Sequence, residues 1–270
     1  MNTGLFQKGV REIWPAAVLC GLGVAVFEAI ACYVFWLYQD QFASNVAEIE
    51  IMRKFISSLV GSDIVGNVGP ETLNSIPWVH PLFLALFWAF AIMVCTRVPS
   101  GEIDRGTVDI LLAMPLSRTQ IFVAEGLLAA GGGLVVLAMA LLGNYVGQSL
   151  IPAEARPEIS RLAVVLLNLY VLYLVVAGMT LLFSSMSDRR GRSVSSAFGV
   201  ILVLFLWNFL AEYWEPAKDA GVVNILTYYK PMPILSDGTF PTVDVVVLAA
   251  VALPLWIAAW QVFERRDVCT

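Results

Sequence analysis

Charged residues are scarce in this sequence. Only 14% of its 270 residues are Asp, Glu, Lys or Arg, whereas ordinary soluble domains contain about 25%. The net charge is −5, so the chain lacks the strong positive charge with which proteins bind a phosphate backbone. The composition therefore excludes a nucleic-acid-binding protein and a disordered tail, and we expect no nucleic acid among the partners.

Cysteine and histidine are rare as well. The sequence contains four cysteines and one histidine, His80. The cysteines form no CxxC pair and no disulfide framework, and a single histidine cannot make a metal site. Walker A, HExxH and acidic-flanked GxGxxG motifs are also missing. We therefore expect no catalytic residue, no metal and no cofactor on this chain, which cannot hydrolyse ATP by itself.

Long hydrophobic runs are what the sequence has in abundance. Hydrophobic residues make up 59% of the chain, and a helix needs roughly 20 of them to cross a bilayer. The runs are continuous and lack the alternation of a membrane β-barrel. We predict an all-α integral membrane protein with one transmembrane domain over residues 1–270. The six expected spans are residues 15–37, 78–95, 121–144, 162–183, 194–210 and 243–263.

The distribution of Lys and Arg predicts the orientation. With both termini inside, the inner segments hold 10 of these residues and the outer segments hold 6. Cytoplasmic loops of membrane proteins carry an excess of Lys and Arg. We therefore expect the chain to lie in the inner membrane of the cell, with both termini in the cytoplasm. Basic residues precede the first run, but its length and Glu28 favour a retained span over a signal peptide.

Two segments outside the spans have apolar residues at helical spacing. Residues 5–14 predict a short amphipathic helix at the inner membrane surface, ahead of the first span. Residues 49–59, in the first outer loop, predict an outer helix that rests on the bundle. Neither outer loop is large enough to form a catalytic domain.

The inner loop between the second and third spans is the most informative segment. Its apolar residues share one helix face, and Glu102, Arg105 and Asp109 share another. This pattern predicts an amphipathic helix over residues 102–114 that is stopped by Pro115. Ser117, with a Gln three residues later, predicts a capping box that opens the third span. From geometry alone, the helix either joins two spans or offers its charges to a soluble partner.

The residue pattern favours a partner. The motif Glu102-x-x-x-Gly106-Thr107-x-x-x-Leu-Leu-x-x-Pro115-Leu-Ser-Arg118 resembles the cytoplasmic loop of the ABC-2 transporter permeases. In that family the loop joins the second and third of six spans and forms the coupling helix that docks on an ATPase subunit. The resemblance covers about twenty residues, found at the matching place in the topology.

The resemblance implies a half-transporter. Two copies of this chain, or this chain and a paralogue, would work with two nucleotide-binding ATPase subunits, which hold ATP and Mg, to export a substrate. The motion would pass through the coupling helix and the short loop 184–193. Glu102, Arg105 and Asp109 would contact the ATPase, and Gly106, next to Thr107, would permit close approach.

Two further positions concern the start of the third span. Pro115 and Arg118 would fix the angle between the coupling helix and this span. Family members often carry Lys just inside the span, where this chain has Glu125. A basic anchor is therefore absent, and we expect a different local contact with the partner.

Polar residues inside the spans have two interpretations each. Glu28 is either a functional carboxylate in the transport pathway or a structural one that is protonated or paired with Tyr or Asn on a neighbouring span. Asn144, Asn168 and Asn208 either face the pathway or, as we expect, form hydrogen bonds between helices. The glycine run 131–133 indicates close helix packing, with a hinge as the alternative.

The leading function is an export permease that contacts membrane lipid, and three alternative functions remain. The chain could serve an ABC system that matures an extracytoplasmic metalloenzyme. It could be a non-ABC multispan channel or scaffold. An intramembrane enzyme is the third, but the sequence lacks the paired polar residues of a protease or transferase. The spans do not identify a substrate.

Overall fold

Helices make up the framework of the protein. The computed structural model describes residues 3–62, 64, 68–108, 113 and 115–266, and these residues contain no β-strand. Six helical stretches are long and apolar enough to cross a membrane. The expected all-α fold with six membrane spans is therefore confirmed. The six stretches are Gly4–Leu37, Pro70–Cys95, Arg118–Ser149, Ala153–Met186, Arg190–Leu210 and Thr242–Arg265.

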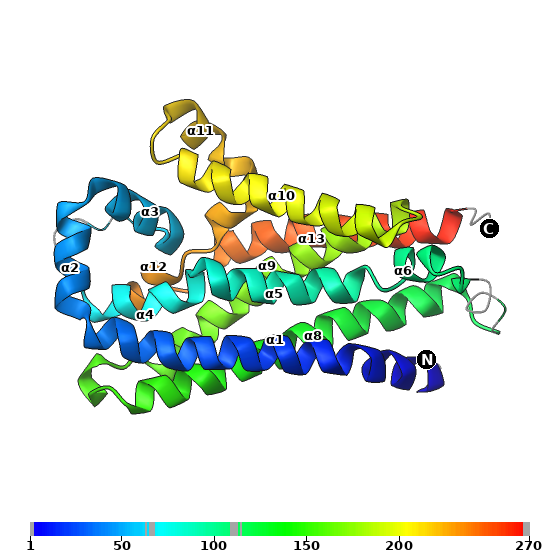
Figure 1. Ribbon diagram of the computed structural model, residues 1–270. Coiled ribbons are helices and arrows are strands. Elements are labelled where there is room, and N and C mark those ends of the chain that lie inside the picture. The colour runs from blue at the N-terminus through cyan, green and yellow to red at the C-terminus, as the bar shows by residue number, and fades with distance from the viewer. Residues whose placement is uncertain (1–2, 63, 65–67, 109–112, 114, 267–270) are drawn as a thin grey trace.

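The spans form one elongated bundle (Figure 1). An even number of crossings returns the chain to its starting side, and both ends of the described chain lie at the same end of the bundle. We call this the termini end and the opposite one the loop end. The spanning helices are α1 (Thr3–Leu37), α4 (Pro70–Val79) with α5 (Pro81–Cys95), α8 (Arg118–Ser149), α9 (Ile159–Met186), α10 (Arg190–Leu210) and α13 (Thr242–Arg265).

The amphipathic N-terminal segment is not a separate helix. Helix α1 continues without a break from Thr3 to Leu37 and includes Pro15. At 1.5 Å per residue, such a helix is about 50 Å long, which exceeds the roughly 30 Å of the hydrocarbon core. The expected interfacial helix is thus the first part of α1. The sequence predicted that the first span begins at residue 15, but helix α1 continues through Pro15 without a break.

The second span begins earlier than expected and consists of two helices. Helix α4 ends before His80, and α5 starts directly after it with Pro81. The Nδ1 atom of His80 accepts a hydrogen bond of 3.2 Å from the backbone N–H of Leu82. The only histidine therefore caps α5 and has a structural role.

Short helices cover the loop end (Figure 1). Helix α3 is the outer helix expected over residues 49–59, and its buried Ile56 and Val60 pack on the bundle. The remaining short elements at this end are α2 (Gln39–Glu48), η1 (Ala153–Ala155), α11 (Glu215–Asp219), η2 (Ala220–Val223), η3 (Ile225–Tyr228) and α12 (Pro231–Asp237), while α3 spans Glu50–Val60.

Small residues bring α1 and α8 into close contact. A Cβ atom at Gly143 would overlap the carbonyl oxygen of Ala25, and one at Gly147 would lie 2.6 Å from that of Ala29. Two Gly four residues apart on α8 thus face two Ala four residues apart on α1, the small-residue spacing that lets membrane helices approach each other. This contact was not predicted from the sequence.

The glycine run in α8 also permits close packing. A Cβ at Gly132 would lie 2.7 Å from the ring of Phe90, and one at Gly133 would overlap the ring of Tyr173. The third glycine, Gly131, has open space beside it. The packing interpretation is therefore confirmed for two of the three glycines.

Candidate functional site

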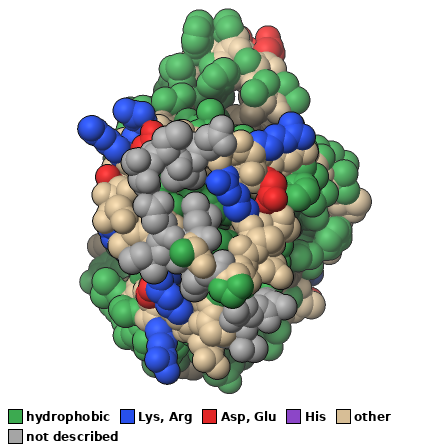
Figure 2. Space-filling view, turned by 90° about the vertical axis from the view of Figure 1, so that its right-hand side faces the viewer, with side chains coloured by type: hydrophobic (Ala, Val, Ile, Leu, Met, Phe, Trp, Pro, Cys, Tyr) green, Lys and Arg blue, Asp and Glu red, His purple; other side chains and the backbone are tan. Residues whose placement is uncertain are grey.

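The segment that resembles a coupling helix lies at the termini end, which Figure 2 shows face on. Basic side chains are spread across this face between hydrophobic and neutral ones. The face is built from the start of α1, the segment 96–108, the start of α8, the loop between α9 and α10, and the end of α13.

The expected helix over residues 102–114 is not continuous. Helix α6 (Ser100–Asp104) ends in a turn at Arg105 and Gly106. Gly106 has φ +68°, a left-handed conformation that glycine adopts without strain. Helical backbone returns at Val108. The apolar periodicity of the sequence passes through this glycine, which is why the break was missed. The predicted contact residue Asp109 lies outside the described residues.

Glu102 faces the protein. The residue is only 5% exposed. Its carboxylate accepts a hydrogen bond from the hydroxyl of Thr107, whose backbone N–H also donates to the carbonyl of Glu102 at 3.0 Å. The Nζ atom of Lys8 lies 3.9 Å from the carboxylate. In the structure this side chain closes the turn, and the expected contact of Glu102 with an ATPase stays a prediction.

The exposed part of the turn is its tip. Asp104, Arg105 and Gly106 are exposed, and no atom lies within 4 Å of a Cβ placed on Gly106. Within the described chain this glycine is needed for its backbone conformation and not for a close contact. The side chain of Arg105 lines a cavity of about 360 Å³ together with Glu12 of α1 and Arg190 of α10.

A buried arginine connects this segment to two spans. The guanidinium of Arg97 donates hydrogen bonds to both carboxylate oxygens of Glu125 at 2.5 Å and to the carboxylate of Glu12. The exposed side-chain fractions are 9% for Arg97 and 5% for Glu125. Lys8 lies 3.6 Å from Glu12. We call Lys8, Glu12, Arg97, Glu102 and Glu125 the ion cluster.

The ion cluster explains the departure from the family pattern. Glu125, which the resemblance places where a basic anchor was expected, here neutralises Arg97. Neither Arg97 nor Glu12 was selected from the sequence. The available signal was a pair of opposite charges, one two residues after the end of the second span and the other just inside the start of the third. Leaving either charge unpaired in a buried place would be costly, so the pair holds α8 to the segment after α5.

The loop between α9 and α10 is joined to α6. The hydroxyl oxygens of Ser100 and Ser184 lie 3.0 Å apart, and the backbone N–H of Ser100 donates to Ser184 at 3.3 Å. Arg190, at the start of α10, donates to the carbonyl of Met93 at 3.2 Å and to the hydroxyl of Thr96 at 3.3 Å. One of the two segments expected to transmit motion, residues 184–193, therefore contacts residues 93–100, which directly precede the other expected segment.

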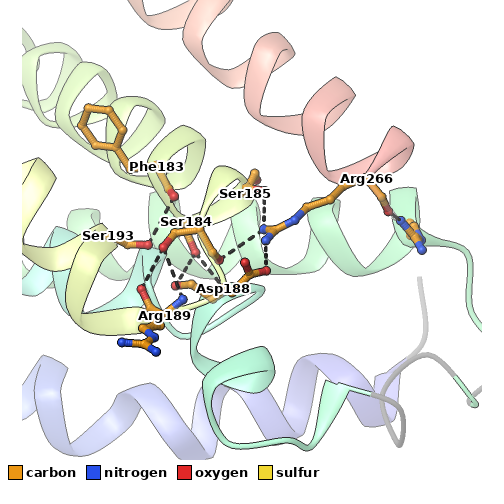
Figure 3. Close-up of polar contacts among 10 residues, drawn as sticks. Phe183, Ser184, Ser185, Asp188, Arg189, Ser193 and Arg266 are labelled. Carbon is orange, nitrogen blue, oxygen red and sulfur yellow. Dashed lines mark hydrogen bonds and ion pairs between the residues drawn. The ribbon is translucent and has the colours of Figure 1, made fainter. Parts of the chain in front are cut away.

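Arg266 holds the same loop from the other side (Figure 3). Its guanidinium donates to the carbonyl oxygens of Ser185 at 2.7 Å and Ser187 at 3.2 Å, and it forms an ion pair with Asp188. Inside the loop, the hydroxyl of Ser193 donates to the carbonyl of Phe183 at 3.2 Å. The end of α13 therefore fixes the loop against the bundle.

The predicted capping box at the start of α8 is confirmed. The backbone N–H of Gln120 donates to the hydroxyl of Ser117, and the backbone N–H of Ser117 donates to the side chain of Gln120, both at 3.1 Å. Pro115 lies exposed in the bend before it. Arg118 donates to the carbonyl oxygens of Phe263, at 3.2 Å, and of Arg266. Arg118 thus orients α8 against α13.

The polar residues within the bundle form hydrogen bonds to neighbouring segments. The amide of Asn144 donates to the carboxylate of Glu28 at 2.9 Å and lies 3.0 Å from the sulfur of Cys32. This contact agrees with the structural interpretation of Glu28, a carboxylate paired with an Asn of a neighbouring span. Asn168 and Asn208 lie apart from it and donate to backbone carbonyls of Tyr228 and Ser58, at 3.2 Å and 2.7 Å. Hydrogen bonding between segments is thus observed for all three asparagines.

Comparison with known proteins agrees with this architecture. The family model described as ABC-2 family transporter protein matches residues 25–268. Similarity also extends to the Uncharacterized protein YhcI of Bacillus subtilis (strain 168), with 25% identity over 208 residues, or 69% of this chain. That match covers 66% of the relative, slightly less than two thirds of its length. Because the family model matches nearly the whole chain, with six possible spans and the inner-loop motif in place, the protein belongs to the ABC-2 family of transporter proteins.

Proposed function

We propose that this chain is the permease subunit of an ATP-driven exporter and that separate ATPase subunits dock on its termini end. Membership of the family implies an ATP-binding partner in an ABC system. The observation that carries the location is the ion cluster. Through Arg97 it joins the segment that holds the inner-loop motif to α1 and α8.

The docking surface consists of the turn tip and its surroundings. Arg105 and the neighbouring Gly106 are exposed there, as is Pro115. Asp109 is part of the same sequence motif and stays a predicted contact. Glu102 and Thr107 act indirectly, because their hydrogen bond sets the shape of the turn that carries Arg105.

Motion of the ATPase would be passed to several spans together. When the ATPase subunits close on ATP, they displace the turn tip. Arg97 carries this displacement to α1 and α8, and the Ser100–Ser184 contact carries it to α9 and α10. Because these links are short polar contacts, and those of Arg97 to Glu125 and of Ser100 to Ser184 are buried, the spans move as connected rigid bodies.

The complete transporter would contain two permease chains, either identical or paralogous, and two ATPase subunits that hold ATP and Mg. The chain would lie in the inner membrane with the termini end in the cytoplasm. Support for this orientation is the excess of Lys and Arg in the segments assigned to that end. Export is the direction implied by the family resemblance.

Affinity purification in a mild detergent tests the proposal. The wild-type chain should retain a P-loop ATPase, which mass spectrometry would identify. Arg105→Ala should weaken this retention because it removes an exposed charge without disturbing the bundle. Lys218→Ala, an exposed basic residue at the loop end, is the matched control and should retain the ATPase fully.

Two results would contradict the proposal. Recovery of no ATPase with the wild-type chain would remove the transporter function. Equal retention of the ATPase by Arg105→Ala and wild type would show that the docking surface lies elsewhere than the turn tip. A third variant, Glu102→Gln, separates shape from contact, because it should weaken retention only as far as it loosens the turn.

A further inference from the structure

Basic residues converge on one cavity at the loop end. The cavity has a volume of about 450 Å³ and lies between α3, the end of α10 and the segment 211–230. Among the described residues that line it, one carries a carboxylate, Glu212. Four carry positive charges, and they are Arg53, Lys54, Lys218 and Lys230.

The four basic residues of this cavity lie in segments where acidic residues outnumber basic ones. The segments assigned to the loop end contain six Lys and Arg residues in all, and acidic residues outnumber them. Four of those six side chains nevertheless line the same cavity. A concave site lined by one sign of charge focuses the electric field and concentrates ligands of the opposite sign. The cavity is therefore a local reversal of charge.

Two of the four cations are held in place by neighbours. The Nζ atom of Lys54 lies 3.0 Å from Glu50 and 4.6 Å from the centre of the Tyr213 ring. The Nζ atom of Lys230 lies 3.7 Å from Asp244. These contacts orient the lysines while they leave other N–H donors of each ammonium free to bind a ligand.

The other two cations have no such neighbours. Among the described residues, Arg53 and Lys218 have no ion-pair partner within 4.0 Å. Arg53 projects from α3 and Lys218 from α11, so they reach the cavity from separate elements. Bringing like charges together costs free energy unless an anion joins them, and this favours a ligand at the site.

Neutral donors complete the lining. Ser57, Ser58 and Thr227 line the cavity, but the hydroxyls of Ser58 and Thr227 already donate to the carbonyl oxygens of Phe55 and Gly221. The Ser57 oxygen accepts a hydrogen bond of 3.2 Å from the backbone N–H of Ile64, which leaves its own proton available. The amide of Asn208 donates to the carbonyl of Ser58 at 2.7 Å and thereby ties α10 to α3. The cavity thus offers both charged and neutral hydrogen-bond donors.

A glycine fixes the wall between α3 and Lys230. Gly61 ends α3 with φ +78°. A Cβ atom on it would lie 2.6 Å from the Cβ and 3.0 Å from the Cα of Lys230. Only glycine allows this approach, so the end of α3 and the backbone at Lys230 form a fixed part of the cavity wall.

We propose that this cavity binds the phosphate group of an anionic ligand. Arg and Lys, supplemented by hydroxyl groups, are the side chains that bind phosphate oxygens. The volume lies within the usual range for small-molecule sites and exceeds that of phosphate alone. The ligand therefore carries further atoms, either as a phospholipid headgroup or as a soluble phosphate ester. The site goes beyond the proposed ATPase coupling, which concerns the opposite end.

Binding is measured on the purified chain in phosphatidylcholine nanodiscs without any ATPase. The first probe is radiolabelled inorganic phosphate, and the second is phosphatidylglycerol added to the discs and detected by native mass spectrometry. Arg53→Gln/Lys218→Gln should lower the affinity of the responding probe about tenfold or more, since each lost charge-assisted bond has a large effect. Arg192→Gln/Arg265→Gln, an equal charge change at the termini end, should leave it unchanged.

The outcomes separate the ligand sources. Saturable phosphate binding that depends on Arg53 and Lys218 supports a soluble phosphate ester as the ligand. Retention of phosphatidylglycerol that depends on the same two residues supports a lipid headgroup. The charge-preserving Arg53→Lys/Lys218→Arg pair should bind like wild type, which excludes simple misfolding. The proposal would be overturned if neither probe bound to the wild-type chain. It would also be overturned if the Arg192→Gln/Arg265→Gln control lost as much affinity as Arg53→Gln/Lys218→Gln. Neither failure would affect the proposed permease function, which is tested by ATPase retention.

Discussion

Basic side chains gather at both ends of the bundle, but their neighbours differ. At the termini end, Arg97 lies between Glu12 and Glu125, and it is almost fully buried. At the loop end, Arg53 and Lys218 face a shared cavity that is accessible to solvent and has few carboxylates. A paired and buried cation holds segments together, whereas unpaired cations in a cavity remain available to a ligand. The same residue types thus serve structure at one end and binding at the other.

The difference in stability between the two ends is expected to be largest for a substitution at Arg97. Arg97→Met leaves Glu125 buried without a counter-charge, which should lower the free energy of unfolding by about 3–5 kcal/mol. Lys218→Met at the loop end should change it by less than about 0.5 kcal/mol. Denaturant titration in mixed micelles measures both values.

A double variant tests the cause. Arg97→Met/Glu125→Gln removes both buried charges and should recover most of the lost stability, because a neutral pair avoids the unpaired charge. If Arg97→Met were as mild as Lys218→Met, or if the double variant were worse than the single one, the ion cluster would not hold the termini end together.

The second largest effect is expected at Gly61. Gly61→Ala forces alanine into a left-handed conformation and pushes its Cβ against Lys230, so it should cost about 2–4 kcal/mol. The same titration measures the loss. Gly61→Asn should be equally harmful, since the added Cβ meets the same backbone. Full tolerance of either change would mean that the cavity wall is not preformed.

Gly106 is the matched position at the termini end. Its φ of +68° is close to that of Gly61, but it has open space beside it. Gly106→Ala should therefore cost only the backbone strain, about 1–2 kcal/mol, and Gly106→Asn should cost less because asparagine tolerates this conformation. A larger loss at Gly106 than at Gly61 would contradict the assignment of contacts at the two ends.

A smaller effect than at either glycine is expected for alanine at Ser184. Ser184→Ala removes its hydrogen bonds to Ser100 and should cost about 0.5–1.5 kcal/mol, because the hydroxyl of Ser100 still donates to the carbonyl of Thr96. ATP-dependent transport should fall more than stability does, since this contact links the two inner loops. Unchanged transport in proteoliposomes would show that the loops act separately.

Local patterns in the sequence were sufficient for much of the fold. The spans follow from continuous apolar runs, and the capping box at Ser117 follows from two residues that lie three positions apart. Helix α3 follows from its apolar spacing. These features depend on neighbours in the chain, so the sequence contains the whole signal.

The sites depend on residues far apart in the chain. Arg97 and Glu125 are 28 positions apart, and Arg53 and Lys218 come from different loops. Their meeting depends on how the helices pack, and composition does not specify that packing. Helical periodicity also continued through Gly106, although a glycine with polar neighbours was the signal for a turn. The inward orientation of Glu102 also required the structure.

The Glu28–Asn144 hydrogen bond also sets an order of events in biosynthesis. Glu28 leaves the ribosome 116 residues ahead of Asn144, a delay of roughly 6–20 seconds at ordinary rates of synthesis. During this interval the first span enters the bilayer without its partner amide, and an ionisable side chain at the centre of a helix opposes insertion by about 2.5–3.5 kcal/mol. The apolar residues around Glu28 must outweigh that cost, and the third span then completes the pair when it arrives.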